Sequence, residues 1–250
     1  MKYKPSTKTE LQELVKDESV YLGDIDTSLI TDMSNLFDRS NVYRRDFSGI
    51  ESWDVSNVTD MSYMFCMCFD FNQPLDSWNV GSVEYMMDMF SHCENFNQPL
   101  NSWDVSNVIT MDSMFCECRK FNQPLNSWNV SNVVDMSCMF FECRKFNQPL
   151  NSWDVSNVTD MSYMFEKCVS FNQPLDEWNV ENVTDMCCMF CGCCNFNRSL
   201  EKWGWKVSKV ETETDMFKGC VSLKNKPSWY EWLVEKCQDE FDDECDETLE

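Results

Sequence analysis

Phe71-Asn-Gln-Pro-Leu-Asp-Ser-Trp-Asn-Val-Gly-Ser-Val-Glu-Tyr-Met-Met-Asp-Met-Phe-Ser-His-Cys-Glu-Asn95 is a 25-residue stretch that recurs, with small changes, through most of the chain. Its tryptophan returns at 25-residue intervals from Trp53 to Trp203. A fixed period of this length is typical of repeat proteins, in which each repeat buries its apolar face against its neighbours. The sequence therefore predicts one elongated stack of repeats rather than separate globular cores.

Two apolar spacings alternate within each repeat. Leu75, Trp78 and Val80 follow the L-x-x-L-x-L spacing of a leucine-rich repeat strand. The next apolar residues are spaced i, i+3, i+4 and i+7, as on one face of a helix: Met86, Met89, Phe90 and Cys93. The proline of Phe-Asn-Gln-Pro then ends the helix. The pattern predicts an α/β solenoid, leucine-rich repeat-like, with parallel strands on one face and short helices on the other.

The ends of the chain depart from the repeat. Residues 1–24 predict an N-terminal cap, with a helix over 5–17 and a short strand at Val20–Leu22, because the first repeat needs a polar cover. Residues 25–223 are the predicted solenoid. Residues 224–250 predict a C-terminal capping helix followed by an acidic tail.

Charge and composition exclude several kinds of partner. The net charge of −23 would repel nucleic acid and anionic membrane surfaces. No stretch has the length and apolarity of a transmembrane helix. The first ten residues lack the apolar run of a signal peptide, which predicts a cytoplasmic location. We expect a monomer with no membrane insertion and no nucleic-acid binding.

Two columns of repeated residues are candidates for the core. Free cysteine behaves as a small buried hydrophobe, and packed helices lie too far apart for these cysteines to be joined by disulfides. The predicted core residues are Trp53, Trp78, Trp103, Trp128, Trp153, Trp178, Cys68, Cys93, Cys118, Cys143, Cys168 and Cys193.

The sequence contains no motif typical of a catalytic site and only an incomplete motif for a metal site. Cys188 and Cys191 form a C-x-x-C pair and are a weak alternative for zinc, but no second pair accompanies them. His92 is the only histidine, and neither a nucleophile elbow nor a phosphate-binding loop is present. We therefore predict no catalytic residues, no metal, no cofactor and no enzyme activity.

One polar column follows the tryptophans and is expected to point out of the open face. Its side chains alternate between carboxylate and amide from one repeat to the next. We predict it as a binding strip: Asp54, Asn79, Asp104, Asn129, Asp154 and Asn179. A separate asparagine column in the turn, which includes Asn132, is expected to bond to the backbone of the neighbouring repeat.

The repeated motif FNQPLxxWxVSNVTDMSxMFxxC resembles the BspA-like leucine-rich repeat family over roughly residues 25–223. That family includes bacterial surface proteins and repeats of unknown function. The resemblance implies protein binding, in some members adhesion to host matrix proteins, and it suggests the cell surface. The chain shows no lipobox or sorting signal, and the family supplies no catalytic residues to transfer.

These observations lead to one expected function and one alternative. We expect a non-catalytic protein–protein interaction module that binds a protein partner, with host proteins among the candidates, through the exposed sheet face. The alternative is an intracellular structural scaffold, or a recombining repeat cassette without a fixed ligand.

Overall fold

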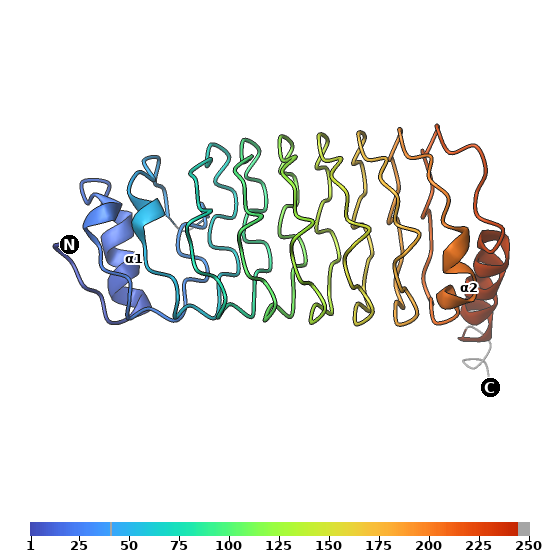
Figure 1. Ribbon diagram of the computed structural model, residues 1–250, viewed down its shortest axis with the longest axis horizontal. Helices are drawn as coiled ribbons and strands as arrows, with labels where there is room; N and C mark the ends of the chain where they lie inside the picture. The colour runs from blue at the N-terminus through green and yellow to red at the C-terminus, as the bar shows by residue number, and fades with distance from the viewer. Residues whose placement is uncertain (41, 245–250) are drawn as a thin grey trace.

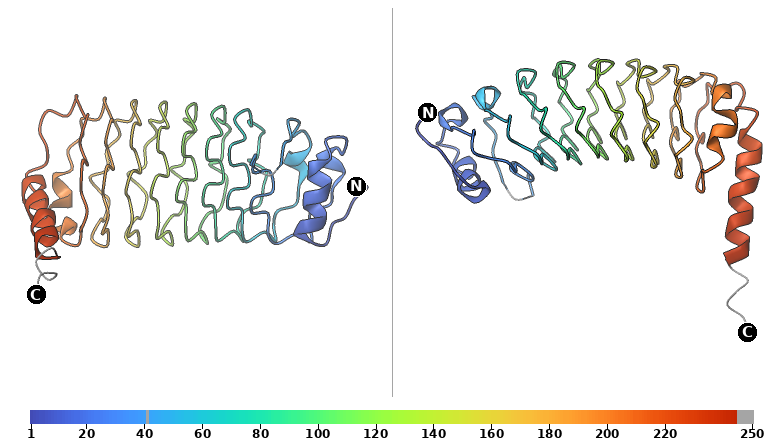
Figure 2. Two further views of the ribbon diagram at one scale, coloured as in Figure 1. Left: turned by 180° about the vertical axis from the view of Figure 1, so that it is seen from behind. Right: turned by 60° about the horizontal axis from the view of Figure 1, so that its bottom comes forward.

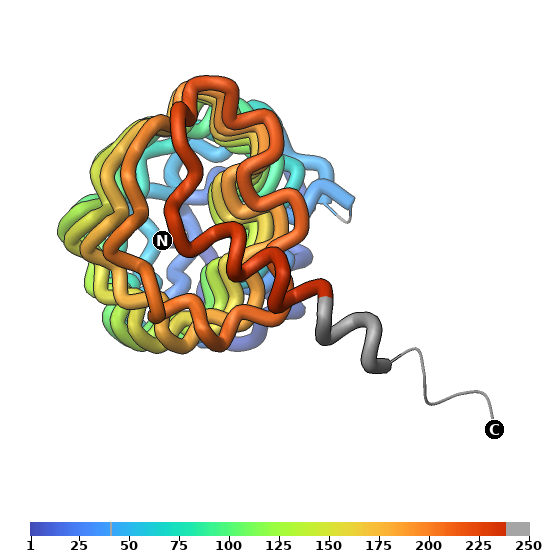
Figure 3. Tube along the Cα trace, turned by 90° about the vertical axis from the view of Figure 1, so that its right-hand side faces the viewer, coloured from blue at the N-terminus to red at the C-terminus, as the bar shows by residue number. Residues whose placement is uncertain are grey.

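The computed structural model describes residues 1–40 and 42–244. Its elements are α1 (Lys8–Lys16), the 3-10 helices η1 (Leu22–Asp24), η2 (Ile50–Ser52) and η3 (Glu201–Val207), and α2 (Tyr230–Glu244). Figures 1 and 2 show a row of stacked coils between α1 at one end and α2 at the other. Seen along the row, successive coils superpose closely (Figure 3).

The predicted parallel strands are absent from the described part of the chain. Each coil instead pairs with the next through an isolated parallel bridge. A turn closed by Val133 N–H and Val130 C=O precedes the bridge residue Asp135, and another closed by Met139 and Met136 follows it. The extended backbone between these turns is too short to form a strand. The bridge residues are Asp32, Asp60, Tyr85, Thr110, Asp135, Asp160, Asp185 and Thr212.

The predicted helix within each repeat is also absent from these residues. In the fourth full coil, main-chain N–H groups at every second position donate to the next coil, as Cys138 N does to Ser162 O at 2.9 Å. The alternate positions close local turns, as Phe141 N does to Cys138 O at 2.9 Å. Cys138 and Glu142 have φ of 54°, which is incompatible with an α-helix. The predicted α/β solenoid, leucine-rich repeat-like, with strands on one face and helices on the other, is therefore wrong.

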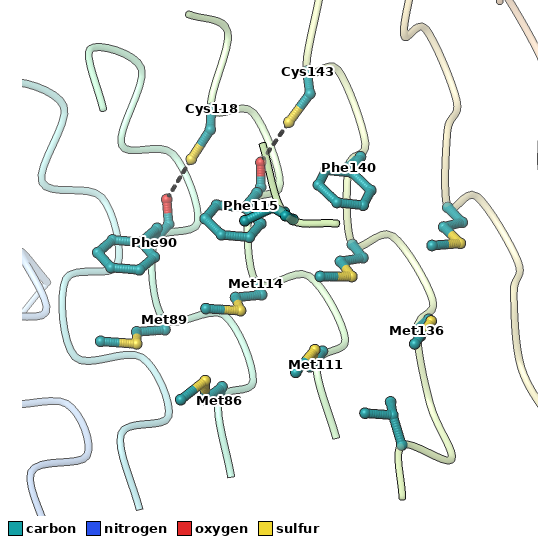
Figure 4. Packing of buried hydrophobic residues seen from close by; sticks show 14 of the residues in the cluster. Met86, Met89, Phe90, Met111, Met114, Phe115, Cys118, Met136, Phe140 and Cys143 are labelled. Atoms are coloured by element: carbon teal, nitrogen blue, oxygen red, sulfur yellow. Dashed lines mark hydrogen bonds between the residues drawn. The ribbon is translucent and has the colours of Figure 1, made fainter. Parts of the chain in front are cut away.

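The buried residues nevertheless lie in columns along the stack. Phe90, Phe115 and Phe140 stack with ring centroids 5.7 and 5.8 Å apart, and all three are fully buried. Beside them, the thiol of Cys118 donates to Phe90 O at 3.1 Å, and that of Cys143 donates to Phe115 O at 2.9 Å (Figure 4). The i, i+3, i+4, i+7 spacing thus marks the buried side of a run of turns.

Helix α1 covers the first coil. The side chain of Thr7 accepts a hydrogen bond from Glu10 N at 3.2 Å and caps the helix, while Leu11 and Val15 are buried against the stack. The strand predicted at Val20–Leu22 is wrong, because this segment leads into η1 instead. The extended pairing at this end joins Tyr3 to Ile25.

The other end of the stack is covered by α2 and the residues before it. Trp229 stacks on Trp203 with centroids 6.2 Å apart and donates to Leu200 O at 2.9 Å, which extends the tryptophan column by one position. Leu233, on α2, is fully buried. Residues 245–250 of the predicted acidic tail lie outside the described residues.

Candidate binding surface

A row of side chains at the surface runs along the stack just before the bridge residues. We name it the exposed ladder; its members are Thr59, Glu84, Ile109, Val134, Thr159, Thr184 and Glu211, of which Thr159 and Thr184 are half-buried and the other five are exposed. Main-chain bonds set its register, since Ile109 N donates to Glu84 O at 2.9 Å and Val134 N donates to Ile109 O at 2.9 Å. Its side chains therefore stand in line, one per coil.

Two adjacent members of the exposed ladder are apolar. Ile109 is 39% exposed and Val134 is 41% exposed, at positions where three other coils carry threonine. A shallow hollow lies beside them, lined by Ser82, Glu84, Asn107, Ile109 and Asn132. The centre of this surface is thus apolar and its edge is polar. Sequence reasoning missed this pair; the signal was the replacement of threonine in two neighbouring repeats.

The predicted Asp/Asn column lies next to the exposed ladder. Asp54, Asn79, Asp104, Asn129 and Asp154 are exposed, whereas Asn179 is half-buried. In the five exposed members one side-chain oxygen accepts from the main-chain N–H two residues ahead, at 3.0 to 3.2 Å. This bond shapes the local turn and leaves the other side-chain atoms facing solvent.

Hydrogen bonding lowers the pKa of two aspartates in this column. The hydroxyl and N–H of Ser56 hold the pKa of Asp54 below its usual value, and Ser106 does the same for Asp104. Both carboxylates are therefore ionised at neutral pH. Because the column alternates with asparagine, carboxylates recur only at every second coil between Asp54 and Asp154.

The asparagines of the turn are bonded to the neighbouring coil. Asn107 Nδ2 donates to Gly81 O, and Asn132 Nδ2 donates to Ser106 O, both at 2.7 Å. These bonds give main-chain carbonyls of the preceding coil a hydrogen-bond donor. They also hold the two side-chain amides that line the hollow in fixed positions.

A second asparagine ladder, in the Phe-Asn-Gln-Pro segment, was not recognised from the sequence. Asn122 Oδ1 accepts from Asn147 N at 3.0 Å and from Gln148 Nε2 at 3.1 Å. The same arrangement repeats in neighbouring coils: Asn97 Oδ1 accepts from Asn122 N at 2.9 Å. This segment is therefore an ordered side of the stack, bonded from coil to coil.

We expect Asn122→Ala to lower the free energy of unfolding by about 1–3 kcal/mol, because Asn147 N–H loses its acceptor in a half-buried place. Urea unfolding of the full chain measures this change. Asn129→Ala is the matched control, since its bond to Ser131 N is exposed and within one turn, and it is expected to cost less. Equal losses for the two variants would contradict a structural role for the ladder.

The predicted core tryptophans and cysteines lie inside the stack. The tryptophans from Trp53 to Trp178 and the cysteines from Cys68 to Cys193, at 25-residue steps, are at most 5% exposed. Each of these tryptophans donates its ring N–H to a carbonyl of the preceding coil, as Trp128 does to Leu100 O at 2.9 Å. The cysteines of the described residues are free thiols.

The residues weighed for metal binding or catalysis lie at two separate places. Cys188 and Cys191 lie in the same turn, half-buried, with Cys187 beside them. Within residues 1–40 and 42–244, no group of three or more histidine, cysteine, aspartate or glutamate side chains is arranged to hold a metal ion. His92 Nδ1 lies 3.5 Å from Glu117 Oε1, beside the ion pair of Glu117 with Arg119.

Comparison with known proteins identifies one family. A family model described as "Mycoplasma protein of unknown function, DUF285" matches residues 9–128 and, in a second match, residues 110–232. No curated protein and no solved structure matches the chain. In the described part of the chain, no helix is both long and apolar enough to span a membrane.

Proposed function

The chain belongs to the DUF285 family of Mycoplasma proteins of unknown function, and from this premise we propose that it is a non-catalytic protein-binding module. Its binding surface is the part of the stack formed by the exposed ladder and the Asp/Asn column. The observation that carries the proposal is the exposed pair Ile109 and Val134 beside a hollow with a polar edge.

The chemistry of this surface supports protein recognition. Protein interfaces combine an apolar centre, which loses water on binding, with a polar rim that sets orientation. Ile109 and Val134 supply the centre, Glu84 supplies an acidic group at the edge of the hollow, and Asp104 supplies a second carboxylate in the Asp/Asn column. The partner is a protein that presents an apolar side chain flanked by basic residues.

The repeat pattern supports the same conclusion. The buried tryptophan, phenylalanine and cysteine positions keep one residue type through the central coils, because each must fill the same space. The exposed ladder changes from glutamate to isoleucine, valine and threonine over the same coils. A rigid frame with variable exposed positions suits recognition by many contacts in register.

The BspA-like resemblance refines the proposal. On its basis we propose that the chain is displayed on the cell surface and that host matrix proteins are the class of partner. Treatment of intact producing cells with an impermeant protease tests this location. Cleavage while a cytoplasmic control protein survives is the expected result, and protection until lysis would overturn surface display without touching the proposed binding surface.

The binding surface is tested with the double variant Ile109→Glu/Val134→Glu. The purified chain is immobilised and presented with cell extract and with a panel of extracellular matrix proteins. Any captured protein is identified, purified and titrated against each variant. We expect the double variant to bind at least ~10-fold more weakly, since burying two unpaired carboxylates at the interface costs more than 1.4 kcal/mol.

A matched control distinguishes binding at this surface from non-specific binding to exposed apolar residues elsewhere. Trp205→Glu/Val221→Glu places the same charges at exposed apolar residues near the C-terminal end of the stack. The control should bind as the wild type does, with both variants first shown to unfold at similar urea concentrations. If every captured protein binds the two double variants equally, the proposed surface is wrong.

A further inference from the structure

One coil carries three neighbouring thiols, whereas each of the other described coils has cysteine at no more than one of these three positions. Cys187, Cys188 and Cys191 are half-buried and lie on the surface of the coil that precedes the last one. In the coil before it, the equivalent residues are Ser162, Tyr163 and Glu166. The proposed binding function uses none of these thiols.

The backbone brings Cys188 and Cys191 together at the two ends of one tight turn. Cys191 N donates to Cys188 O at 2.9 Å, which closes a four-residue turn. The Cα atoms at the ends of such a turn are less than about 7 Å apart, within the range that a disulfide bridges.

The neighbouring coil holds this turn in place. Cys188 N donates to Thr214 O at 2.9 Å, and Gly192 N donates to Lys218 O at 2.7 Å. Cys188 has φ of 53°, a conformation that these bonds maintain. The sulfur of Cys187 lies 3.9 Å from that of Cys188, but adjacent cysteines can be joined only through a strained eight-membered ring.

We propose that Cys188 and Cys191 are a reversible dithiol–disulfide site, oxidised by low-molecular-weight disulfides such as oxidised glutathione. The Cys191 thiolate attacks the small disulfide and releases one thiol, leaving a mixed disulfide on Cys191. The Cys188 thiolate then attacks the Cys191 sulfur and releases the second thiol. Two protein thiols become one disulfide, and the small disulfide is reduced to two thiols.

The surroundings of the two sulfurs determine how fast the dithiol is oxidised. Burial raises the pKa of Cys188 to about 12. Burial and the carboxylates of Glu166 and Asp215 also raise the pKa of Cys191. The neighbouring Cys188 and the ammonium of Lys218 lower the pKa of Cys191. Because Cys188 has no such lowering influence, Cys191 is assigned the first attack. Only thiolate reacts, and its fraction grows about tenfold per pH unit below the pKa. Oxidation should therefore be slow at neutral pH and roughly tenfold faster at pH 8 than at pH 7.

The chain offers a direct way to locate the bond. Met189 lies between the two cysteines, so cyanogen bromide separates residues 187–189 from residues 190–216. The full-length reduced protein is incubated with oxidised glutathione at pH 7 and pH 8, quenched with acid, alkylated and cleaved. Mass spectrometry should find fragment 187–189 joined to fragment 190–216, with the joined fraction growing about tenfold faster at pH 8.

Single serine variants identify the sulfurs. Cys187→Ser and Cys194→Ser should keep the joined fragments, whereas Cys188→Ser and Cys191→Ser should lose them. Separate fragments in the wild type, a bond within fragment 187–189, or joined fragments in Cys188→Ser would each overturn the proposal. Absence of the joined fragments in the wild type overturns the proposal by itself, so the proposal can be disproved even if a variant fails to fold.

Discussion

Replacing Trp128 by alanine is expected to lower the free energy of unfolding by about 3–5 kcal/mol, the usual cost of deleting a buried aromatic ring. Trp128 is only 4% exposed and stacks between Trp103 and Trp153, with centroids 6.4 Å away on each side. Its ring N–H donates to Leu100 O at 2.9 Å, and that carbonyl loses its partner in the variant. The loss removes packing on two neighbouring coils at once.

Urea unfolding measures this loss, and the chain supplies its own control. Trp205 is 69% exposed, so Trp205→Ala should change the free energy of unfolding by no more than about 0.5 kcal/mol. Trp128→Phe keeps an aromatic ring and should cost about 1–3 kcal/mol through the unpaired carbonyl. If Trp128→Ala were no worse than Trp205→Ala, the tryptophan column would not be part of the stabilising core.

Cys138→Pro is expected to cost about 3 kcal/mol or more, because it disrupts the joint between two coils. Proline fixes φ near −65°, whereas residue 138 has φ of 54°. Proline also removes the N–H that donates to Ser162 O at 2.9 Å. We expect a large fall in the urea midpoint of the full chain.

Cys138→Gly distinguishes backbone conformation from loss of the thiol. Glycine adopts positive φ without strain and keeps the N–H, so this variant should remain within about 1 kcal/mol of the wild type. Similar destabilisation by glycine and proline would show that the side chain of Cys138, rather than the backbone of the turn, controls stability at this site.

The register of the stack could be predicted from sequence because it follows from repetition alone. Identical residues at 25-residue intervals occupy equivalent places in successive repeats. The columns through Trp128 and Cys143 are therefore expected for any backbone conformation that repeats with this period. The backbone itself could not be predicted in this way. The spacing of Met136, Met139, Phe140 and Cys143 fits one face of a helix as well as one side of a run of turns.

The left-handed residues explain why the helix prediction failed. Cys138 and Glu142 have side chains that ordinarily favour negative φ, so their conformation is not visible in the sequence. The one signal was Gly192 and Gly219. These glycines occupy the repeat position that Glu142 has in its own coil, and their φ values are 73° and 76°. Two glycines at one repeat position indicate a left-handed residue there.

The binding surface was only partly predictable. The Asp/Asn column lies on the surface, directly after the buried tryptophans in sequence. Its hydrogen bonds to the main-chain N–H groups two residues ahead depend on the turn, which the sequence did not predict. The exposure of Ile109 and Val134 depends on the corner that the backbone makes before the bridge residue. Alternation of polar and apolar residues does not reveal such a corner.

The direction of the bonds between coils has a mechanical consequence. Helices α1 and α2 lie at opposite ends of the row, and bonds such as Cys138 N to Ser162 O join one coil to the next along it (Figure 1). A force pulling the termini apart therefore loads the joints in series, and the weakest opens first. Each opened coil frees 25 residues, or roughly 80–90 Å of extended chain, so the protein under tension is an extensible tether that lengthens in equal steps.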